Sequence, residues 1–240
     1  MTDSTEEPLL RPYHGALSSL RLRALEMGGL VADQVMIAVR ALLEYDQQAA
    51  ELVLTRERQV NAYDTEIEAE SFRLLARQSP VAGDLRSILA VARAVTDLER
   101  AGDEAKKIAR FALATISRSG GDPSIPVHRH LRHMAQLASG MMRSAIDALD
   151  RGDPTVAHEV ARQDWELDRE FEAALRQLMT LAMEEARLMR PTIDTFFALK
   201  SLERIGDHAK NVAEHVVFLV SGDDVRHLHD AQRAGSGASH

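Results

Sequence analysis

An internal duplication constrains this chain of 240 residues more than any other feature. When the sequence is shifted by 104 positions, LERAGD at 98–103 falls on LERIGD at 202–207, and acids in an earlier segment also coincide. The coinciding acids are Asp64 with Asp168, Glu66 with Glu170, and Glu68 with Glu172. No gap is needed to align these positions. The repeat predicts two copies of one structural unit, packed together.

Each copy is expected to contain three helices. Apolar residues recur at three- and four-residue intervals, and no segment between turns alternates with a period of two. The predicted helices span 16–45, 46–78, 84–117, 127–149, 154–189 and 191–222. We therefore expect an all-α fold of two tandem three-helix bundles, at 14–118 and 127–222, related by the internal duplication. The tail at 223–240 is expected to be largely disordered.

Local signals refine these helices. Asp84 and Asp153 are predicted N-caps, and Pro154 follows at a first helical position, where its missing N–H is tolerated. Gly28 and Gly29 lie inside the first helix, where each destabilises by about 1 kcal/mol relative to alanine. Such glycines predict a close contact or a kink.

Both copies carry a pair of acids on one helix face. Glu99 and Asp103 are four residues apart, as are Glu203 and Asp207. Like charges at this spacing destabilise a helix by roughly 0.2–0.5 kcal/mol. A single pair would indicate only a solvated surface, but the pair recurs beside a glycine inside both helices. The repetition favours a functional site.

Antiparallel packing is expected to add further ligands. If the second helix turns near residue 81, Asp64 lies close to the level of Glu99, and Asp168 is its counterpart in the second copy. Clustered oxygen ligands suit Mg²⁺, Ca²⁺, Mn²⁺ or iron. The candidate metal ligands are Asp64, Glu99 and Asp103 in the first copy, and Asp168, Glu203, Asp207 and Asn211 in the second. Alternatively, Arg100 and Arg204 neutralise these acids without a metal, and the sequence leaves both interpretations open.

Two long segments resemble signatures of the PhoU family. The segment 201–227, SLERIGDHAKNVAEHVVFLVSGDDVRH, is similar to the C-terminal family signature, and 78–109 resembles the matching signature of the first half. The resemblance implies a PhoU-like six-helix fold, usually a homodimer, in the cytoplasm. It also implies metal ions held at E/D-x-x-x-D motifs, which correspond here to 99–103 and 203–207. Mg, Mn, Fe and Zn are not distinguished.

The family resemblance also implies a function. It predicts a non-enzymatic negative regulator of the phosphate-starvation response and of phosphate uptake. The expected partners are the ATPase subunit of the phosphate ABC importer and a PhoR-type sensor kinase of the PhoR–PhoB pair, with membrane association only through these partners.

Lys107 stands where the second copy has Asn211, which favours the second copy as the stronger metal site.

The composition narrows the remaining alternatives. The chain has no cysteine, and its net charge of −8 argues against nucleic-acid binding. No signal peptide or membrane-spanning apolar run is visible. A carboxylate-bridged metalloenzyme would require Glu-x-x-His motifs, and none occurs. A metal-free structural adaptor remains open. His208 and His215 are interpreted as helix-face or interface histidines rather than ligands.

Overall fold

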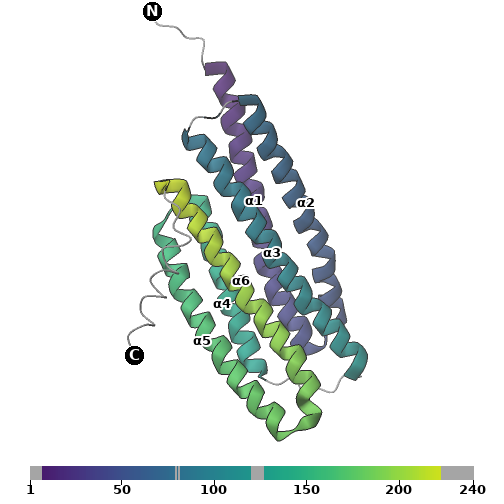
Figure 1. Ribbon diagram of the computed structural model, residues 1–240. Coiled ribbons are helices and arrows are strands. Elements are labelled where there is room, and N and C mark those ends of the chain that lie inside the picture. The colour runs from purple at the N-terminus through teal and green to yellow at the C-terminus, as the bar shows by residue number, and fades with distance from the viewer. Residues whose placement is uncertain (1–6, 79, 81, 120–126, 223–240) are drawn as a thin grey trace, which may run out of the picture.

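Two three-helix bundles lie against each other in the computed structural model (Figure 1). The structure describes residues 7–222, apart from 79, 81 and 120–126, so the predicted tail lies outside the described residues. The elements are α1 (Glu7–Glu44), α2 (Gln47–Gln78), α3 (Ala82–Ser119), α4 (His128–Arg151), α5 (Thr155–Glu184), the short 3₁₀ helix η1 (Ala186–Leu188) and α6 (Met189–Ser221). The predicted all-helical fold of two repeats is confirmed. None of the described helices has the length and apolarity needed to cross a membrane.

Several helix ends differ from the predictions. The first helix begins earlier, at Glu7, and α3 begins at Ala82, so Asp84 lies in its first turn and is not its N-cap. The fifth helix ends sooner than predicted because Glu185 is extended, with φ −134° and ψ 101°. Asp153 does act at the start of α5, where its carboxylate accepts hydrogen bonds from the backbone N–H and the hydroxyl of Thr155.

The burial pattern corrects the gap-free alignment of the two repeats. Between α3 and α6 the buried residues do coincide at a shift of 104, as Leu98 and Leu202 illustrate. For the first two helices they coincide at a shift of 107. The coinciding buried pairs include Ala24 with Leu131, Val35 with Met142, Leu42 with Leu149, Val53 with Val160, Glu57 with Asp164, Val60 with Leu167 and Ile67 with Ala174. The second repeat therefore makes a connection between its second and third helices that is three residues shorter.

The first turn of each repeat gives the same register. Tyr45 and Gly152, which end α1 and α4, both adopt left-handed backbone conformations with φ of 56° and 63°. Asp46 follows Tyr45 and caps α2 by accepting a hydrogen bond of 2.9 Å from the N–H of Ala49. Asp46 is therefore equivalent to Asp153, whereas a shift of 104 would place it on Asp150, nearly one helical turn away.

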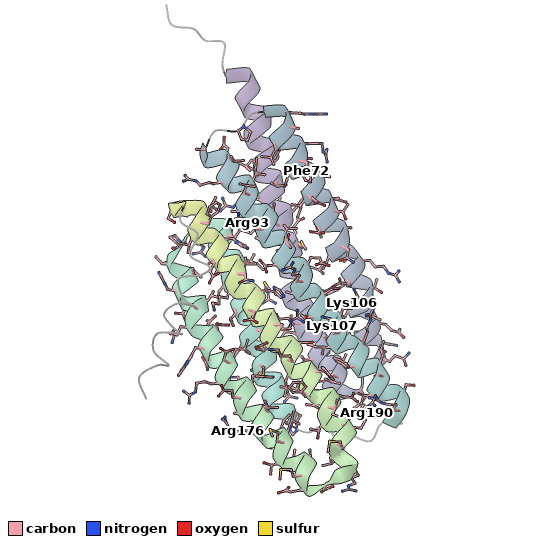
Figure 2. All side chains as sticks on the ribbon, in the orientation of Figure 1. Phe72, Arg93, Lys106, Lys107, Arg176 and Arg190 are labelled. Carbon is pink, nitrogen blue, oxygen red and sulfur yellow. The ribbon has the colours of Figure 1, made fainter. Side chains whose placement is uncertain are left out.

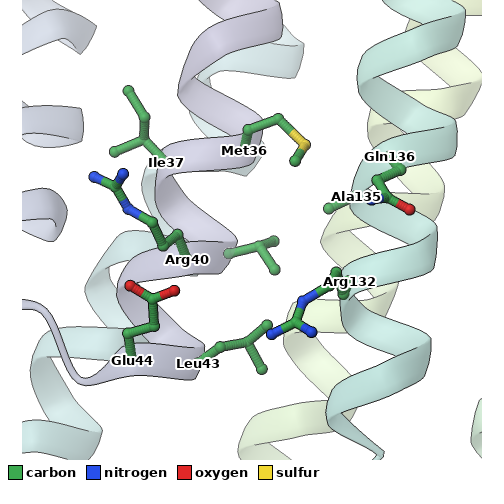
Figure 3. Close-up of a pocket in the computed structure, with 9 residues that line it drawn as sticks. Met36, Ile37, Arg40, Leu43, Glu44, Arg132, Ala135 and Gln136 are labelled. Carbon is green, nitrogen blue, oxygen red and sulfur yellow. The ribbon is translucent and has the colours of Figure 1, made fainter.

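The repeats pack through α1 against α4 and through α3 against α6 (Figure 1). A Cβ atom on Gly28 of α1 would lie 2.4 Å from Ile146 Cδ1 of α4, while one on Gly29 would meet nothing within 4 Å. The predicted close contact is thus confirmed at Gly28. Further along the same pair of helices, a cavity of about 300 Å³ opens between α1 and α4, with Met36, Leu43 and Arg132 among its lining residues (Figure 3).

Candidate functional site

Three carboxylates form a compact group between α2 and α3. Glu57, Glu99 and Asp103 each offer an oxygen atom, and these atoms lie within 4.8 Å of one another. Helix α3 supplies Glu99 and Asp103 from adjacent turns of one face, as the sequence predicted, and α2 supplies Glu57. Asp64, predicted as the third ligand, is not a member of this compact group.

Glu57 is the unusual member of the group. The residue is 2% exposed, and neither of its carboxylate oxygens accepts a hydrogen bond, although the protonated carboxyl can donate one to Asp103. Burial raises the pKa of Glu57 to about 7, and the charges of Asp103 and Glu99 add to this effect, while Lys106 opposes it. A carboxyl group with this pKa exchanges its proton near neutral pH.

The glycine of the LERAGD motif permits this close approach of α2 to α3. A Cβ atom on Gly102 would lie 3.1 Å from Glu57 Oε2 and 3.2 Å from Val60 Cγ1. The same position lies 3.6 Å from Oε1 of Gln34, a fully buried side chain on α1 whose amide atoms have no hydrogen-bond partner. Around Gly102 the oxygen atoms of Glu57 and Gln34 are therefore buried and accept no hydrogen bond, and unpaired oxygen ligands suit a hard cation.

The basic side chain at this group is Lys106. Its ammonium group lies 2.6 Å from Asp103 Oδ1 and 3.6 Å from Glu57 Oε1. Burial favours a higher pKa for Asp103, but the hydrogen bond and charge of Lys106 outweigh burial and lower it. Lys106 therefore contributes more than Arg100 to the neutralisation that the metal-free interpretation requires.

In the second repeat, two lysines form ion pairs with the acidic side chains. Asp207 keeps an exposed surface, but partial desolvation of its carboxyl raises its pKa to about 6, reinforced by the charges of Glu203, Asp164 and Asp168. Lys210 lies 3.2 Å from Asp164, and Lys200 lies 2.6 Å from Glu203. Position 96 in the first repeat, equivalent to Lys200, is a threonine.

Within the described part of the chain, only the first repeat brings three metal-ligating side chains within 4.8 Å of one another. The structure therefore favours the first repeat as a metal site, against the preference drawn from Lys107 and Asn211. Lys107 pairs with Glu104 at 2.8 Å, and the Asn211 amide donates to Asp97 at 3.0 Å. Both side chains thus engage acids of α3 that lie outside the compact group, although Lys107 adds a weaker positive charge near Asp103.

The acids Asp97 and Glu104 belong to the interface between α3 and α6. His208 Nδ1 lies 2.9 Å from Asp97, and the Ser201 hydroxyl donates to Glu104 at 3.0 Å. A shift of 104 carries each of these pairs onto the other, so the two contacts are related by the pseudo-twofold symmetry of the repeats. His215 Nε2 also lies 2.9 Å from Asp97. Both histidines are buried interface residues, as the sequence interpretation held.

Asp64 lies beside the compact group. It lines a cavity of about 310 Å³ between α2 and α3, together with Glu99 and Glu68. Burial raises the pKa of Asp64, and Glu68 raises it further. Burial and the charges of Asp103 and Asp64 likewise raise the pKa of Glu99. Asp64 therefore lies near Glu99 along the α2–α3 hairpin, as predicted, but it lines the cavity and is not part of the compact group.

Comparison with known proteins identifies the architecture. The sequence profile of the PhoU domain matches the chain twice, at residues 24–112 and 131–216. This chain belongs to the PhoU family. It is 42% identical over 226 residues to the PhoU homolog of Pseudomonas aeruginosa strain PAO1, covering 94% of this chain and 92% of that protein.

A further PhoU protein and two solved PhoU structures also match most of the chain. The phosphate-specific transport system accessory protein PhoU of Escherichia coli K12 is 33% identical over 216 residues, which cover 90% of this chain and 88% of that protein. The crystal structure of PhoU from P. aeruginosa superposes with a TM-score of 0.83 at 41% identity, covering 88% of this chain and all of that one. PhoU of Streptococcus pneumoniae gives a TM-score of 0.79 at 25% identity, covering 88% and 98%.

Sequence reasoning missed Glu57, although a signal for it exists. The buried face of α2 contains Ala50, Val53, Val60 and Ile67, and Glu57 occupies the apolar stripe at helical spacing between Val53 and Val60. An acid at a core position requires a partner or a proton. Asp164 breaks the stripe of α5 in the same way, but the gap-free alignment placed it opposite Val60 and hid the equivalence.

Proposed function

We propose that this PhoU protein is a non-enzymatic regulator of phosphate homeostasis, which represses the phosphate-starvation response and restrains phosphate uptake. The observation that carries the proposal is the match of two PhoU domains within an alignment that spans 94% of the chain. The relatives are named as accessory proteins of the phosphate-specific transport system, and the S. pneumoniae structure as a phosphate transport system regulatory protein.

The proposed setting follows from the family resemblance. The protein would act in the cytoplasm as a homodimer, with the ATPase subunit of a phosphate ABC importer and a PhoR-type sensor kinase. It would reach the membrane only through these partners. The net charge of −8 is compatible with docking on basic partner surfaces and argues against nucleic acid as a target.

The acidic group of the first repeat is the proposed metal site. Glu57, Glu99 and Asp103 would hold a divalent or iron cation, which supplies the positive charge that three neighbouring carboxylates need. Lys106 would move away from Asp103, and Glu57 would release its proton, as metal ligands do. The compact group contains no histidine, so nothing favours the metalloenzyme alternative over a regulatory cation.

Deletion and complementation in the native host test the regulatory function. Removing the gene is expected to switch on a phosphate-starvation reporter in phosphate-rich medium, and the intact gene is expected to restore repression. Retained repression in the deletion strain would contradict the proposal. Pull-down of the importer ATPase subunit and of the sensor kinase would then distinguish the two proposed contacts.

Calorimetry on metal-stripped protein tests the cation site. Titration with Mn²⁺, Fe²⁺, Zn²⁺ and Mg²⁺ in separate experiments is expected to show stoichiometric binding that Glu99→Gln weakens at least about tenfold. Glu66→Gln is the matched control, because Glu66 lies on the exposed part of α2 with a side chain that is 60% exposed. Absence of stoichiometric binding by the intact chain would leave the metal-free adaptor as the better interpretation.

A further inference from the structure

The cavity between α2 and α3 has an apolar floor and an acidic edge. Its volume is about 310 Å³, and the floor includes the buried side chains of Ile67, Ile88 and Val95. Phe72 lines the same cavity although its side chain is 64% exposed, and it projects from the upper part of α2 (Figure 2). An exposed aromatic ring beside an open apolar cavity is a common feature of protein contact sites.

In the second repeat, side chains of the protein itself occupy the position equivalent to this cavity. With the register established by burial, Asp64 corresponds to Phe171, Ala92 to Phe196 and Thr96 to Lys200. The rings of Phe171 and Phe196 lie 6.3 Å apart, and the Lys200 ammonium lies 5.6 Å above the ring of Phe171. Two phenyl rings and one cation thus occupy the position that the first repeat leaves open.

The acidic edge of the cavity also lacks the positive charge that its equivalent has in the second repeat. Lys200 contacts Glu203 at 2.6 Å in the second repeat. Glu99, the equivalent of Glu203, has no lysine at position 96 and lines the cavity beside Asp64 and Glu68. Three carboxylates therefore gather at this edge, and an incoming cation would offset their mutual repulsion.

We infer that the α2–α3 cavity is a docking site for an amphipathic helix of a partner protein. That helix places an aromatic side chain on the apolar floor and a lysine or arginine, one turn further along, against Asp64 and Glu99. The ring fills the volume that Phe196 fills in the second repeat, with Phe72 as its neighbour. The cation takes the role of Lys200. The site requires no metal, so this inference does not depend on the proposed metal site.

A labelled peptide tests the inference with the full chain. The probe is a 16-residue fluorescein-labelled helix of alanine and glutamine that carries one phenylalanine and a lysine four residues later, and binding is followed by anisotropy in EDTA. The intact protein is expected to bind it with a dissociation constant below about 100 μM, typical of a small peptide interface. Replacing the peptide phenylalanine with alanine should weaken binding at least about tenfold.

Two substitutions copy the second repeat into the first. Ala92→Phe supplies the ring of Phe196 and is expected to weaken peptide binding at least about tenfold, because the floor is then occupied. Thr96→Lys supplies the cation of Lys200 at an exposed position and should weaken binding about threefold or more, even if Ala92→Phe disturbs folding. Ala69→Phe is the control, since Ala69 is exposed on α2 and does not line the cavity.

Other outcomes would overturn the inference. They include no saturable binding of the peptide up to about 1 mM, equal binding by the peptide without phenylalanine, and unchanged binding by both cavity variants. If Ala92→Phe converted a dimer into a monomer in sedimentation velocity while peptide binding was absent, the occupant would be a second copy of this chain. If binding required added Mn²⁺ in place of EDTA, the acids would serve a metal and not the partner cation.

Discussion

We expect the buried carboxyl of Glu57 to make the free energy of unfolding depend on pH, and we expect one substitution to remove this dependence. Its carboxyl is buried, and its pKa is raised from 4.5 to about 7 in the folded protein. Below about pH 4.5 the group is protonated in both the folded and the unfolded state, so it has no effect on stability. Between about pH 4.5 and pH 7 the group ionises in the unfolded chain but stays largely protonated in the folded one. The folded state therefore loses stability with increasing pH.

The size of this loss follows from the two pKa values. A difference between 4.5 and about 7 corresponds to roughly 3 kcal/mol when the group is ionised in both states, at about 1.4 kcal/mol for each factor of ten. Part of the effect is already present at pH 5. Between pH 5 and pH 8 we expect Glu57 to reduce the free energy of unfolding by about 2.5 kcal/mol. Glu57→Gln should abolish this contribution, because an amide of similar shape does not ionise.

Urea unfolding in EDTA at pH 5 and pH 8 measures the effect. The free energy of unfolding of Glu57→Gln, minus that of the unchanged protein, is expected to be about 2.5 kcal/mol higher at pH 8 than at pH 5, so the variant is relatively more stable at pH 8. Glu66→Gln on the exposed part of the same helix should show no such difference. An equal effect of Glu57→Gln at both pH values would refute the reasoning, since it would mean that the carboxyl ionises as easily inside the fold as in water.

Three further predictions concern packing and capping, and thermal unfolding at pH 7 checks each. Gly28→Ala is expected to destabilise by about 1–3 kcal/mol because its Cβ would lie 2.4 Å from Ile146 Cδ1, whereas Gly29→Ala, with no atom within 4 Å, should stabilise by up to about 1 kcal/mol. Asp97→Asn should destabilise the protein by about 2–4 kcal/mol. Burial alone would raise the Asp97 pKa, but hydrogen bonds from two histidines and an asparagine lower it. The ionised carboxylate therefore stabilises the fold at pH values above the ordinary aspartate pKa. Asp46→Ala should lose about 1 kcal/mol with its cap. Unchanged midpoints for Gly28→Ala and Asp97→Asn would contradict the described packing.

Features that depend on local spacing were predictable from the sequence. The apolar periodicity predicts six long helices, and helical geometry alone places Glu99 and Asp103 on one face. The resemblance of 78–109 and 201–227 predicts the family, which the PhoU-domain matches at 24–112 and 131–216 confirm, and the family gives the fold. These predictions hold because residues three or four apart on a helix are neighbours in any tertiary setting.

Features that depend on the register between helices were not predictable in the same way. The shift of 104, correct for α3 and α6, assigned Asp168 to Asp64, whereas buried residues in α2 and α5 coincide at 107. A difference of three residues is nearly one helical turn, so both alignments keep the acids on similar faces and sequence identity cannot distinguish them. Side-chain packing can, because it assigns Asp164 to the place of Glu57.

The sequence by itself determined that this protein is a duplicated, all-helical PhoU protein with a paired acidic motif in each half. Only the tertiary structure decided which acids meet and which base lies beside them. The motif glycine Gly102 lets α2 approach α3 at Glu57, and Lys106 reaches the resulting group. The length of the connection between the second and third helices sets the level at which they pack. That length differs between the repeats, so closely similar motifs sit among different neighbours in the two halves of the molecule.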